Sequence, residues 1–181
     1  MAAGLLPGDA PVSLNEARGW LRLGSTIDDA VVAGLVRAAT NICEAFIGHW
    51  LVIREVEEVL SLRAGQVRLS ARPVAVIDAA VLLTAAGDET ALDAGAYRLR
   101  HGRDGSGQLV IEQPGDAERV RVSYRAGIAE NPNGIPEAIR QGIVRMVQHL
   151  HDARDAAPVA PPAAIAALWQ PWRRMTLGSG Q

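Results

Sequence analysis

The residues of this chain that could most readily do chemistry are three close neighbours, His101, Asp104 and Ser106. A histidine, a carboxylate and a hydroxyl can together form the triad of a hydrolase. These three lie within a glycine-rich segment, 102–107, whose composition predicts a hairpin turn. No second histidine is placed to act on a distant serine. We therefore expect a turn, and a hydrolase built on His101 and Asp104 is kept as an alternative.

Metal and cofactor sites find little support among the remaining candidates. His149 and His151 are two residues apart on an expected helix, so they point roughly 200° apart and cannot chelate one ion as an i, i+4 pair does. A single cysteine, Cys43, excludes an internal disulfide and a zinc site of several thiolates, and we expect it to be buried. The chain contains no lysine, which excludes Schiff-base and phosphate-loop lysines. We therefore expect that the chain is not an enzyme and that it binds neither a metal nor a cofactor.

A row of arginines is the first candidate for binding rather than catalysis. It alternates with apolar residues on the cleanest predicted strand, and it consists of Arg119, Arg121 and Arg125. Such a row could bind phosphates, form the wet face of a sheet, or pair with acids on a neighbouring subunit. The net charge of −2 provides no global basic field for nucleic acid, which favours the last two interpretations.

The C-terminal segment is the second candidate. After an Ala/Pro linker over 155–162, large apolar side chains and arginines gather outside any obvious core. They are Leu168, Trp169, Pro171, Trp172, Arg173 and Arg174. Tryptophan and arginine dominate the binding hot spots of protein interfaces. The segment therefore either docks onto a partner or folds back onto its own domain. The apolar stretch 156–169 is too short and contains too many prolines to span a bilayer, so we expect no membrane partner.

Helices are expected on both sides of the chain's middle. Ser13 to Glu16 reads as a capping box that opens a short helix to about Leu23, and Thr26 caps a second helix that ends at Gly48. The predicted buried stripe of the second helix is Ile27, Val31, Leu35, Ala38, Ala39, Ile42 and Phe46. Pro136 is expected to be the first residue of a third helix, with the stripe Ile135, Ile139, Ile143, Met146, Val147 and Leu150. Residues 163–169 could add two further turns.

Between these helices the hydrophobic period changes to two, which predicts five or six mostly antiparallel strands. Residues 74–83 are nearly all apolar and predict a strand that is covered on both faces. The expected fold is α+β: a small bundle of two N-terminal helices and one C-terminal helix, an inserted β unit and an extended tail. We expect one domain over 13–154, with helical parts 13–48 and 135–154 and a β insertion 50–127, followed by a linker and docking tail over 155–181.

The order of these motifs resembles that of the head–tail connector, or adaptor, proteins of long-tailed phages and gene transfer agents. The resemblance covers roughly residues 13–174. Its matching positions are Ser13 to Ala17, Leu21-Arg22, Asp28-Asp29, Leu35, Ala38-Ala39, Glu44, Gly48, Leu51, Arg54, Leu69, Arg72 to Val74, Ile77, Tyr97 to Leu99, Val122, Tyr124, Ala126-Gly127, Ile135-Pro136, Ala138 to Arg140, Val147, His149-Leu150, Arg154 and Leu168 to Arg173. In the family's closing Leu-x-x-Pro-aromatic-Arg pattern the aromatic residue is usually a tyrosine, and this chain has Trp172 at that position.

The resemblance implies a structural subunit of a virion neck, assembled in the bacterial cytoplasm. Such proteins form a twelvefold ring below the portal, and double-stranded DNA passes through the ring without specific binding. The C-terminal segment 168–174 would dock into the portal, and a stopper or tail protein would bind the opposite rim. The arginine row is a weaker candidate for contact between subunits. The alternative is a small DNA-binding accessory protein that uses the arginine row, for which retention on DNA would be sensitive to salt.

Overall fold

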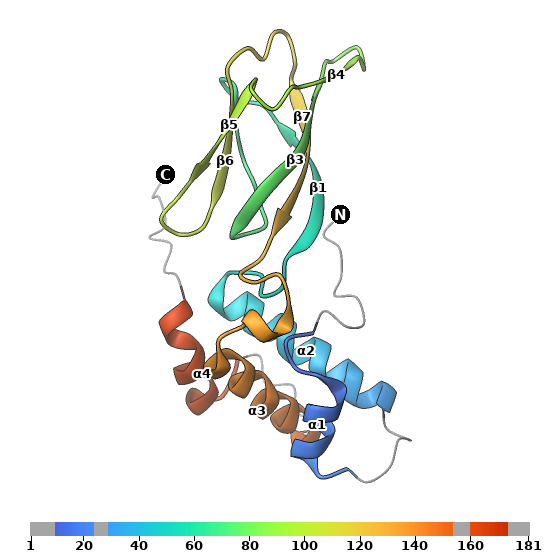
Figure 1. Ribbon diagram of the computed structural model, residues 1–181, viewed down its shortest axis with the longest axis vertical. Coiled ribbons are helices and arrows are strands. Elements are labelled where there is room, and N and C mark those ends of the chain that lie inside the picture. The colour runs from blue at the N-terminus through green and yellow to red at the C-terminus, as the bar shows by residue number, and fades with distance from the viewer. Residues whose placement is uncertain (1–9, 24–28, 154–159, 174–181) are drawn as a thin grey trace. The chain divides into compact units, whose positions relative to one another are not determined.

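The computed structural model describes residues 10–23, 29–153 and 160–173 of the chain (Figure 1). These residues form two compact units. One is helical and is built from residues up to Val52 and from Ala129 onward, and the other is a β unit over Ile53–Ile128. The β unit is thus inserted in the sequence of the helical unit. Each unit has its own core, so the two are described separately.

The first two helices of the helical unit begin and end largely as the sequence predicts. Helix α1 spans Leu14–Leu21, and the Ser13 hydroxyl caps it by accepting a hydrogen bond from the Glu16 N–H at 3.1 Å. Helix α2 spans Asp29–Ile47 and stops at Gly48, whose φ of 73° is a left-handed conformation that glycine adopts without strain. The predicted cap Thr26 lies outside the described residues.

The second half of the unit contributes two helices and two short 3₁₀ turns. The turn η1 (Pro132–Gly134) precedes α3 (Glu137–Ala153), and α4 (Ala163–Trp169) continues into η2 (Gln170–Trp172). Helix α3 packs against α1, α2 and α4 (Figure 1). Where the unit's two chain segments meet, the Ala129 N–H donates to the Leu51 carbonyl at 3.0 Å. The expected packing of the outer helical segments on each other is confirmed.

The buried stripe of α3 is confirmed, while the stripe predicted for α2 is wrong. In α3, the side chains of Ile139, Ile143, Met146 and Val147 are all fully buried. In α2, the buried apolar positions are Val32, Val36, Ala39, Cys43 and Ile47, and the polar Thr40 and Glu44 are buried beside them. This stripe is turned by about 100° from the predicted one. Val31 is 58% exposed. The cause is that α2 is apolar on nearly every side, so its periodicity could not select the inward face.

The β unit consists of two antiparallel sheets that face each other (Figure 1). The larger sheet has the strand order β1-β7-β3-β4, formed by β1 (Arg54–Ser61), β7 (Arg119–Ala126), β3 (Val74–Leu83) and β4 (Glu89–Ala91). The smaller sheet has the order β2-β6-β5, formed by β2 (Gln66–Arg68), β6 (Gly107–Ile111) and β5 (Tyr97–His101). Strand β7 is central: Arg119 pairs with Ser61 of β1 and with Leu83 of β3.

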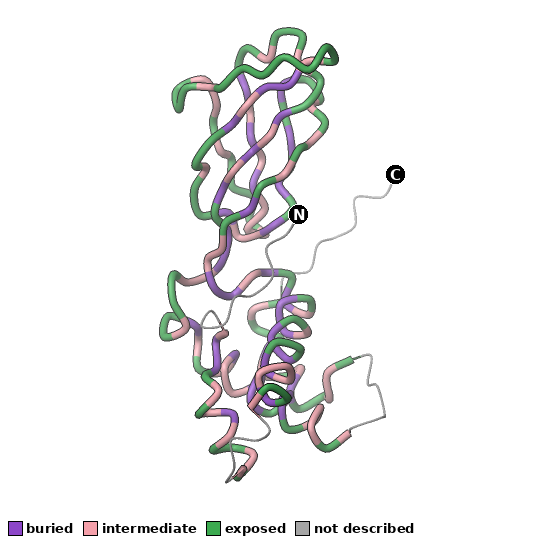
Figure 2. Tube along the Cα trace, turned by 90° about the vertical axis from the view of Figure 1, so that its right-hand side faces the viewer, coloured by how far each residue is buried: buried purple, intermediate pink, exposed green. Residues whose placement is uncertain are grey.

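The core of the β unit comes from alternate residues of these strands, as the period of two predicts (Figure 2). Val120, Val122 and Tyr124 of β7 are at most 1% exposed. The prediction that residues 74–83 are covered on both faces is wrong, because Val76 is 38% exposed and its neighbour Ala75 is exposed as well. This strand lies in an antiparallel sheet with one open face, where small apolar residues are tolerated.

The predicted α+β class with an antiparallel insertion is confirmed. Two details differ from the expectation. The two turns allowed over 163–169 form a second C-terminal helix, α4, beside the one counted in the expected bundle, and the described residues of the β unit form seven strands instead of five or six. Helix α2 is long and apolar enough to cross a membrane by length and composition, with a mean hydropathy of 1.5. Here its buried side packs on α1, α3 and α4, as the central helix of a bundle does.

Candidate functional site

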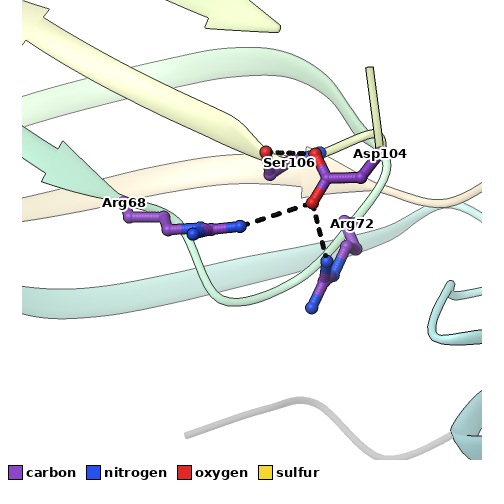
Figure 3. Close-up of polar contacts among 4 residues, drawn as sticks. All are labelled: Arg68, Arg72, Asp104 and Ser106. Atoms are coloured by element: carbon purple, nitrogen blue, oxygen red, sulfur yellow. Dashed lines mark hydrogen bonds and ion pairs between the residues drawn. The ribbon is translucent and has the colours of Figure 1, made fainter. Parts of the chain in front are cut away.

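Asp104 holds the turn between β5 and β6, where the sequence raised the possibility of a triad. Its carboxylate accepts hydrogen bonds from the Ser106 hydroxyl at 2.5 Å and the Ser106 N–H at 3.2 Å. It also pairs with Arg72 at 3.2 Å and with Arg68 at 3.3 Å (Figure 3). The two bonds from Ser106 and the nearby Arg68 charge hold the pKa of Asp104 below its usual range. This carboxylate is therefore engaged in shaping the turn.

The turn does not reproduce the geometry of a hydrolase triad. In a triad the serine hydroxyl bonds the imidazole and the imidazole bonds the carboxylate, whereas here the Ser106 hydroxyl donates directly to Asp104. His101 is exposed at the end of β5. A Cβ at Gly102 would lie 2.3 Å from the Ser106 Oγ and 2.6 Å from the Asp104 Oδ1, so only glycine fits beside the pair. The geometry favours the turn interpretation.

The arginine row lies on the open face of the larger sheet, and two of its three members are paired with acids of that same sheet. The Arg121 guanidinium makes two bonds to the Glu89 carboxylate, at 2.6 and 3.1 Å. Arg125 lies 3.3 Å from the Asp78 carboxylate. The hydrogen bond from Arg121 lowers the pKa of Glu89. Arg119 is exposed at the start of β7. The acids are therefore supplied within the sheet, and contact with a second subunit stays a prediction.

Cys43 and the predicted metal candidates do not assemble a reactive site. Cys43 is fully buried in α2, as expected, and burial raises the pKa of its thiol far above the usual range. His149 and His151 lie near the end of α3, and both are half-buried. Within residues 10–23, 29–153 and 160–173, no group of three histidines, cysteines or acids lies close enough together to hold a metal ion.

The C-terminal segment divides into a buried anchor and a more accessible end. Trp169 is fully buried, and its indole N–H donates to the Ile139 carbonyl of α3 at 3.2 Å. The indole also lies against Phe46 of α2, with ring centroids 5.8 Å apart. The expectation that Trp169 lies outside the core is therefore wrong. For this residue the fold-back alternative describes the structure.

The other predicted docking residues follow this anchor. Leu168 and Trp172 are half-buried, whereas Pro171 and Arg173 are exposed. The Arg173 guanidinium lies 5.0 Å from the centre of the Phe46 ring, in a cation–π contact. Arg174 lies outside the described residues. Arg173 is thus held against α2, while it and Trp172 remain at least partly accessible to solvent.

Gly142 is a residue that the sequence reasoning missed. A Cβ at this position of α3 would lie only 2.2 Å from the Trp169 Nε1 and 2.8 Å from its Cε2. The glycine therefore provides the notch in which the indole sits. The sequence did contain a sign of this contact. A glycine inside a helix costs about 1 kcal/mol relative to alanine, so its presence indicates that another group packs closely against it.

The helical unit also contains a mostly apolar cavity of about 510 Å³. The Arg140–Glu16 ion pair, at 2.9 Å, forms part of its wall. The remaining lining residues are Ala10, Pro11, Val12, Ser13, Leu14, Ala33, Val36, Arg37, Pro132 and Asn133. None of these side chains brings a nucleophile and a base together.

Comparison with known proteins gives matches among solved structures. No family model and no curated protein matches the chain. A chain in the neck of an empty gene transfer agent particle, computed with C6 symmetry, is 26% identical with a TM-score of 0.77; the match covers 99% of this chain and 96% of that one. A chain in the virion of a native gene transfer agent particle is 24% identical, with a TM-score of 0.75 and coverage of 97% and 95%.

A third match, in the neck of a native particle computed with C12 symmetry, is also 24% identical, with a TM-score of 0.75 and coverage of 99% and 96%. The two matches at 24% identity support the fold alone. Together the three show that this chain has the fold of gene transfer agent neck proteins over nearly its full length. The resemblance drawn from the order of the sequence motifs is confirmed.

Proposed function

We propose that this chain is a structural subunit of the neck of a gene transfer agent or related phage-like particle, and that it is not an enzyme. The observation that carries the proposal is the match of 26% identity to a neck protein, which covers 99% of this chain. Because it includes both the helical and the β unit, the similarity is not that of one common module. Function lies in sites more than in folds, so the specific contacts need their own arguments.

Within the neck, we assign the chain to a ring that joins the portal to the next stopper or tail protein. The matched necks were computed with C6 and C12 symmetry, which supports a ring, and we expect twelve copies. Cyclic rings are built from heterologous interfaces, so each subunit must present two different surfaces to its neighbours. A chain of this size can supply both of them from one helical unit.

DNA would pass through the ring without being held. Each phosphate that a protein neutralises adds affinity by releasing counterions, so a channel is better served by few free cations. The chain has no lysine and a net charge of −2. In the row proposed for the alternative DNA-binding function, Arg121 and Arg125 are paired with Glu89 and Asp78. These pairs favour the neck function over the DNA-binding alternative.

Portal docking is assigned to the end of the C-terminal segment, with Trp169 as the residue that positions it. Burial of Trp169 in the Gly142 notch fixes the direction in which the chain leaves α4. The docking side chains are Leu168, Pro171, Trp172, Arg173 and Arg174. An aromatic residue beside arginines on a fixed support is the composition expected of a binding hot spot.

The test is co-purification of the full-length chain with the portal protein of the same particle, followed by negative-stain imaging. We expect full-length protein to cap the portal as a ring and a chain truncated after Asp155 to fail. Because truncation also removes the buried Trp169, a sharper variant is Trp172→Ala, which leaves the anchor in place. It should weaken capping, whereas Trp20→Ala, at a tryptophan 42% exposed on α1, should not.

Absence of portal binding by the full-length chain would overturn the proposal. In that case, retention on DNA should be measured between low and high salt. Strong retention that falls steeply with salt would support the alternative function through the arginine row.

A further inference from the structure

Helix α2 has two apolar faces whose directions differ by about 120°, and the helical unit fully buries only one of them. The inward side carries the buried stripe Val32, Val36, Ala39, Cys43 and Ile47. The outward side carries a second stripe, hereafter the outer stripe, which consists of Val31, Leu35, Ala38, Ile42 and Ala45. At 100° per residue, all five point within about 60° of the direction of Ala38. The same sector also contains Gly34 and the exposed Asn41, and it contains no charged residue.

The outer stripe is not covered by the rest of the described chain. Val31 is 58% exposed, and Ala38 and Ala45 are exposed, while Leu35 and Ile42 are half-buried. The outward face of α3 is an internal control, because it belongs to the same unit and carries Gln141, Arg145, Gln148 and Asp152. A helix that faces water normally has such a polar side. The apolar outward side of α2 is thus a property of that helix and not of the whole unit.

We propose that the outer stripe of α2 is one of the two surfaces through which a copy of this chain binds a second copy in the ring. The inference rests on the proposed neck function, which requires contacts between copies. It names a surface distinct from the portal-docking segment and from the arginine row.

A second copy fits the outer stripe better than the chain's own remaining segments do. From Val31 to Ala45 the stripe runs about 21 Å along the helix. Residues 24–28 and 154–159 offer only Ile27 and Val159 as large apolar side chains, too few for the five positions of the stripe. Residues 174–181 contain only Met175 and Leu177 as large apolar side chains, too few for five positions. Residues 1–9 likewise offer only Met1, Leu5 and Leu6.

The chemistry of the stripe also describes its partner surface. Ala38 at its centre and Ala45 at its end let another backbone approach closely, and Val31, Leu35 and Ile42 add apolar area. A matching surface must itself be free of charge, since a carboxylate or ammonium placed there would lose water without gaining a partner. Interfaces that bury such a centre tolerate a single introduced charge poorly.

The experiment compares Ala38→Glu, at the centre of the stripe, with Arg145→Glu, on the outward face of α3. Arg145→Glu is the control: it reverses a charge at an exposed helical position, whereas Ala38→Glu only adds one. Both variants should unfold at the same temperature as the wild-type chain. Two properties of the full-length proteins are then measured: ring formation on the portal, by imaging, and self-association at high concentration without the portal, by sedimentation.

We expect Ala38→Glu to weaken self-association at least about tenfold and to abolish complete rings, and Arg145→Glu to leave both unchanged. An Ala38→Cys variant gives an independent readout with a maleimide, because the native Cys43 is fully buried. Its added thiol should react in the monomer and be protected in the ring.

The outcomes separate this inference from the proposed function. If wild-type and Ala38→Glu chains both cap the portal equally well, and the thiol added by Ala38→Cys stays reactive in the ring, the outer stripe is not an interface while the neck function stands. If the wild-type chain does not bind the portal but self-associates, and Ala38→Glu abolishes this self-association, the outer stripe is an interface and the proposed neck function is wrong. A wild-type chain that neither caps the portal nor self-associates would overturn both.

Discussion

The helical unit and the β unit hold their outer parts in place by different interactions. In the helical unit, the C-terminal segment is fixed by the buried Trp169 in the Gly142 notch. In the β unit, surface turns and strands are fixed by charge pairs, among them Asp104 with Arg72 and Arg121 with Glu89. Burial of a large apolar side chain contributes strongly to the free energy of folding, whereas each exposed ion pair contributes little.

This difference indicates where partners can bind. On the open face of the larger sheet, Arg121 and Arg125 are paired with acids of the same unit, so these two arginines offer reduced attraction to a phosphate or to a carboxylate from outside. The helical unit leaves the apolar outward side of α2 without a covering element among the described residues. Surface of that kind drives protein association, while satisfied ion pairs mainly maintain solubility and orientation.

The aromatic residues allow the two units to be followed separately. All four tryptophans, at positions 20, 50, 169 and 172, belong to the helical unit, and both tyrosines, at 97 and 124, belong to the β unit. Tryptophan fluorescence during denaturation therefore reports the unfolding of the helical unit. Hydrogen exchange of strand amides can report the β unit in the same samples.

The largest expected effect breaks the apolar anchor of the helical unit. Trp169→Ala should lower the free energy of unfolding of that unit by about 3–5 kcal/mol, since it leaves a large cavity at α3. Gly142→Ala should cost about 1–3 kcal/mol, because the added methyl group collides with the indole. Denaturant titration followed by tryptophan fluorescence measures both, with three tryptophans remaining in the first variant.

The two substitutions should be strongly non-additive. Once Trp169 is absent, Gly142→Ala meets no indole and should stabilise the unit by up to about 1 kcal/mol through its better helix propensity. The sign of the Gly142→Ala effect thus reverses between the two backgrounds. Additive losses would mean that the notch does not hold the tryptophan.

The next effect concerns a buried hydroxyl that ties the β unit together. The Tyr124 hydroxyl donates to the Glu58 carboxylate of β1 and accepts from the Ala71 N–H at 3.0 Å. Burial, and then the bond to Glu58, raise the pKa of Tyr124 well above its usual range, so the hydroxyl keeps its proton. Tyr124→Phe leaves the Ala71 N–H unpaired and should cost about 1–3 kcal/mol.

Hydrogen exchange locates this second effect. Amides of β1, β3 and β7 should exchange faster in Tyr124→Phe, while tryptophan fluorescence during unfolding stays unchanged. Tyr97→Phe is the matched control, because Tyr97 is only half-buried at the start of β5. Equal exchange in the two variants would show that the β unit depends on its surface pairs more than on this hydroxyl.

Sequence reasoning predicted the elements of this fold better than it predicted which of their faces are buried. The helix stop at Gly48 and the cap at Ser13 follow from local backbone chemistry, which the sequence states directly. The α2 stripe was placed on the wrong side because both sides of that helix are apolar, and only tertiary packing selects between them. The error itself points to the outer stripe.

For the candidate site, amino-acid composition was enough to identify the candidate segments, but the sequence did not predict which residues contact them. The aromatic and arginine content of the C-terminal segment singled it out, but the burial of Trp169 depends on Gly142, which lies 27 positions earlier in the chain. The arginine row was recognised from its alternation, whereas its partners Asp78 and Glu89 lie on other strands. Pairings of that kind follow from sheet register, which short-range patterns do not specify.

The smallest expected effect is the pH-dependent contribution of Asp104 to the stability of the β unit. Because the folded pKa of this carboxyl is depressed, its contribution to stability is present above the unfolded value of about 3.9 and is lost as the pH falls through the folded value. The group lies at the surface and is screened by solvent, so we expect a small change in global stability. The local pKa, measured by carboxyl NMR titration, is the more sensitive quantity.

Two variants rank the causes of that depression. The hydrogen bond from the Ser106 hydroxyl is the largest cause, and the charge of Arg68 is a smaller one. Ser106→Ala should therefore raise the pKa of Asp104 more than Arg68→Ala does. Added salt should raise the pKa of Asp104 in the wild-type protein by screening Arg68, and should do so less in Arg68→Ala, where the ion pair with Arg72 remains. The reverse ranking would mean that ion pairing and not turn geometry holds this part of the β unit. The contrast with the anchored helical unit would then become sharper, because charge alone would fix the turn.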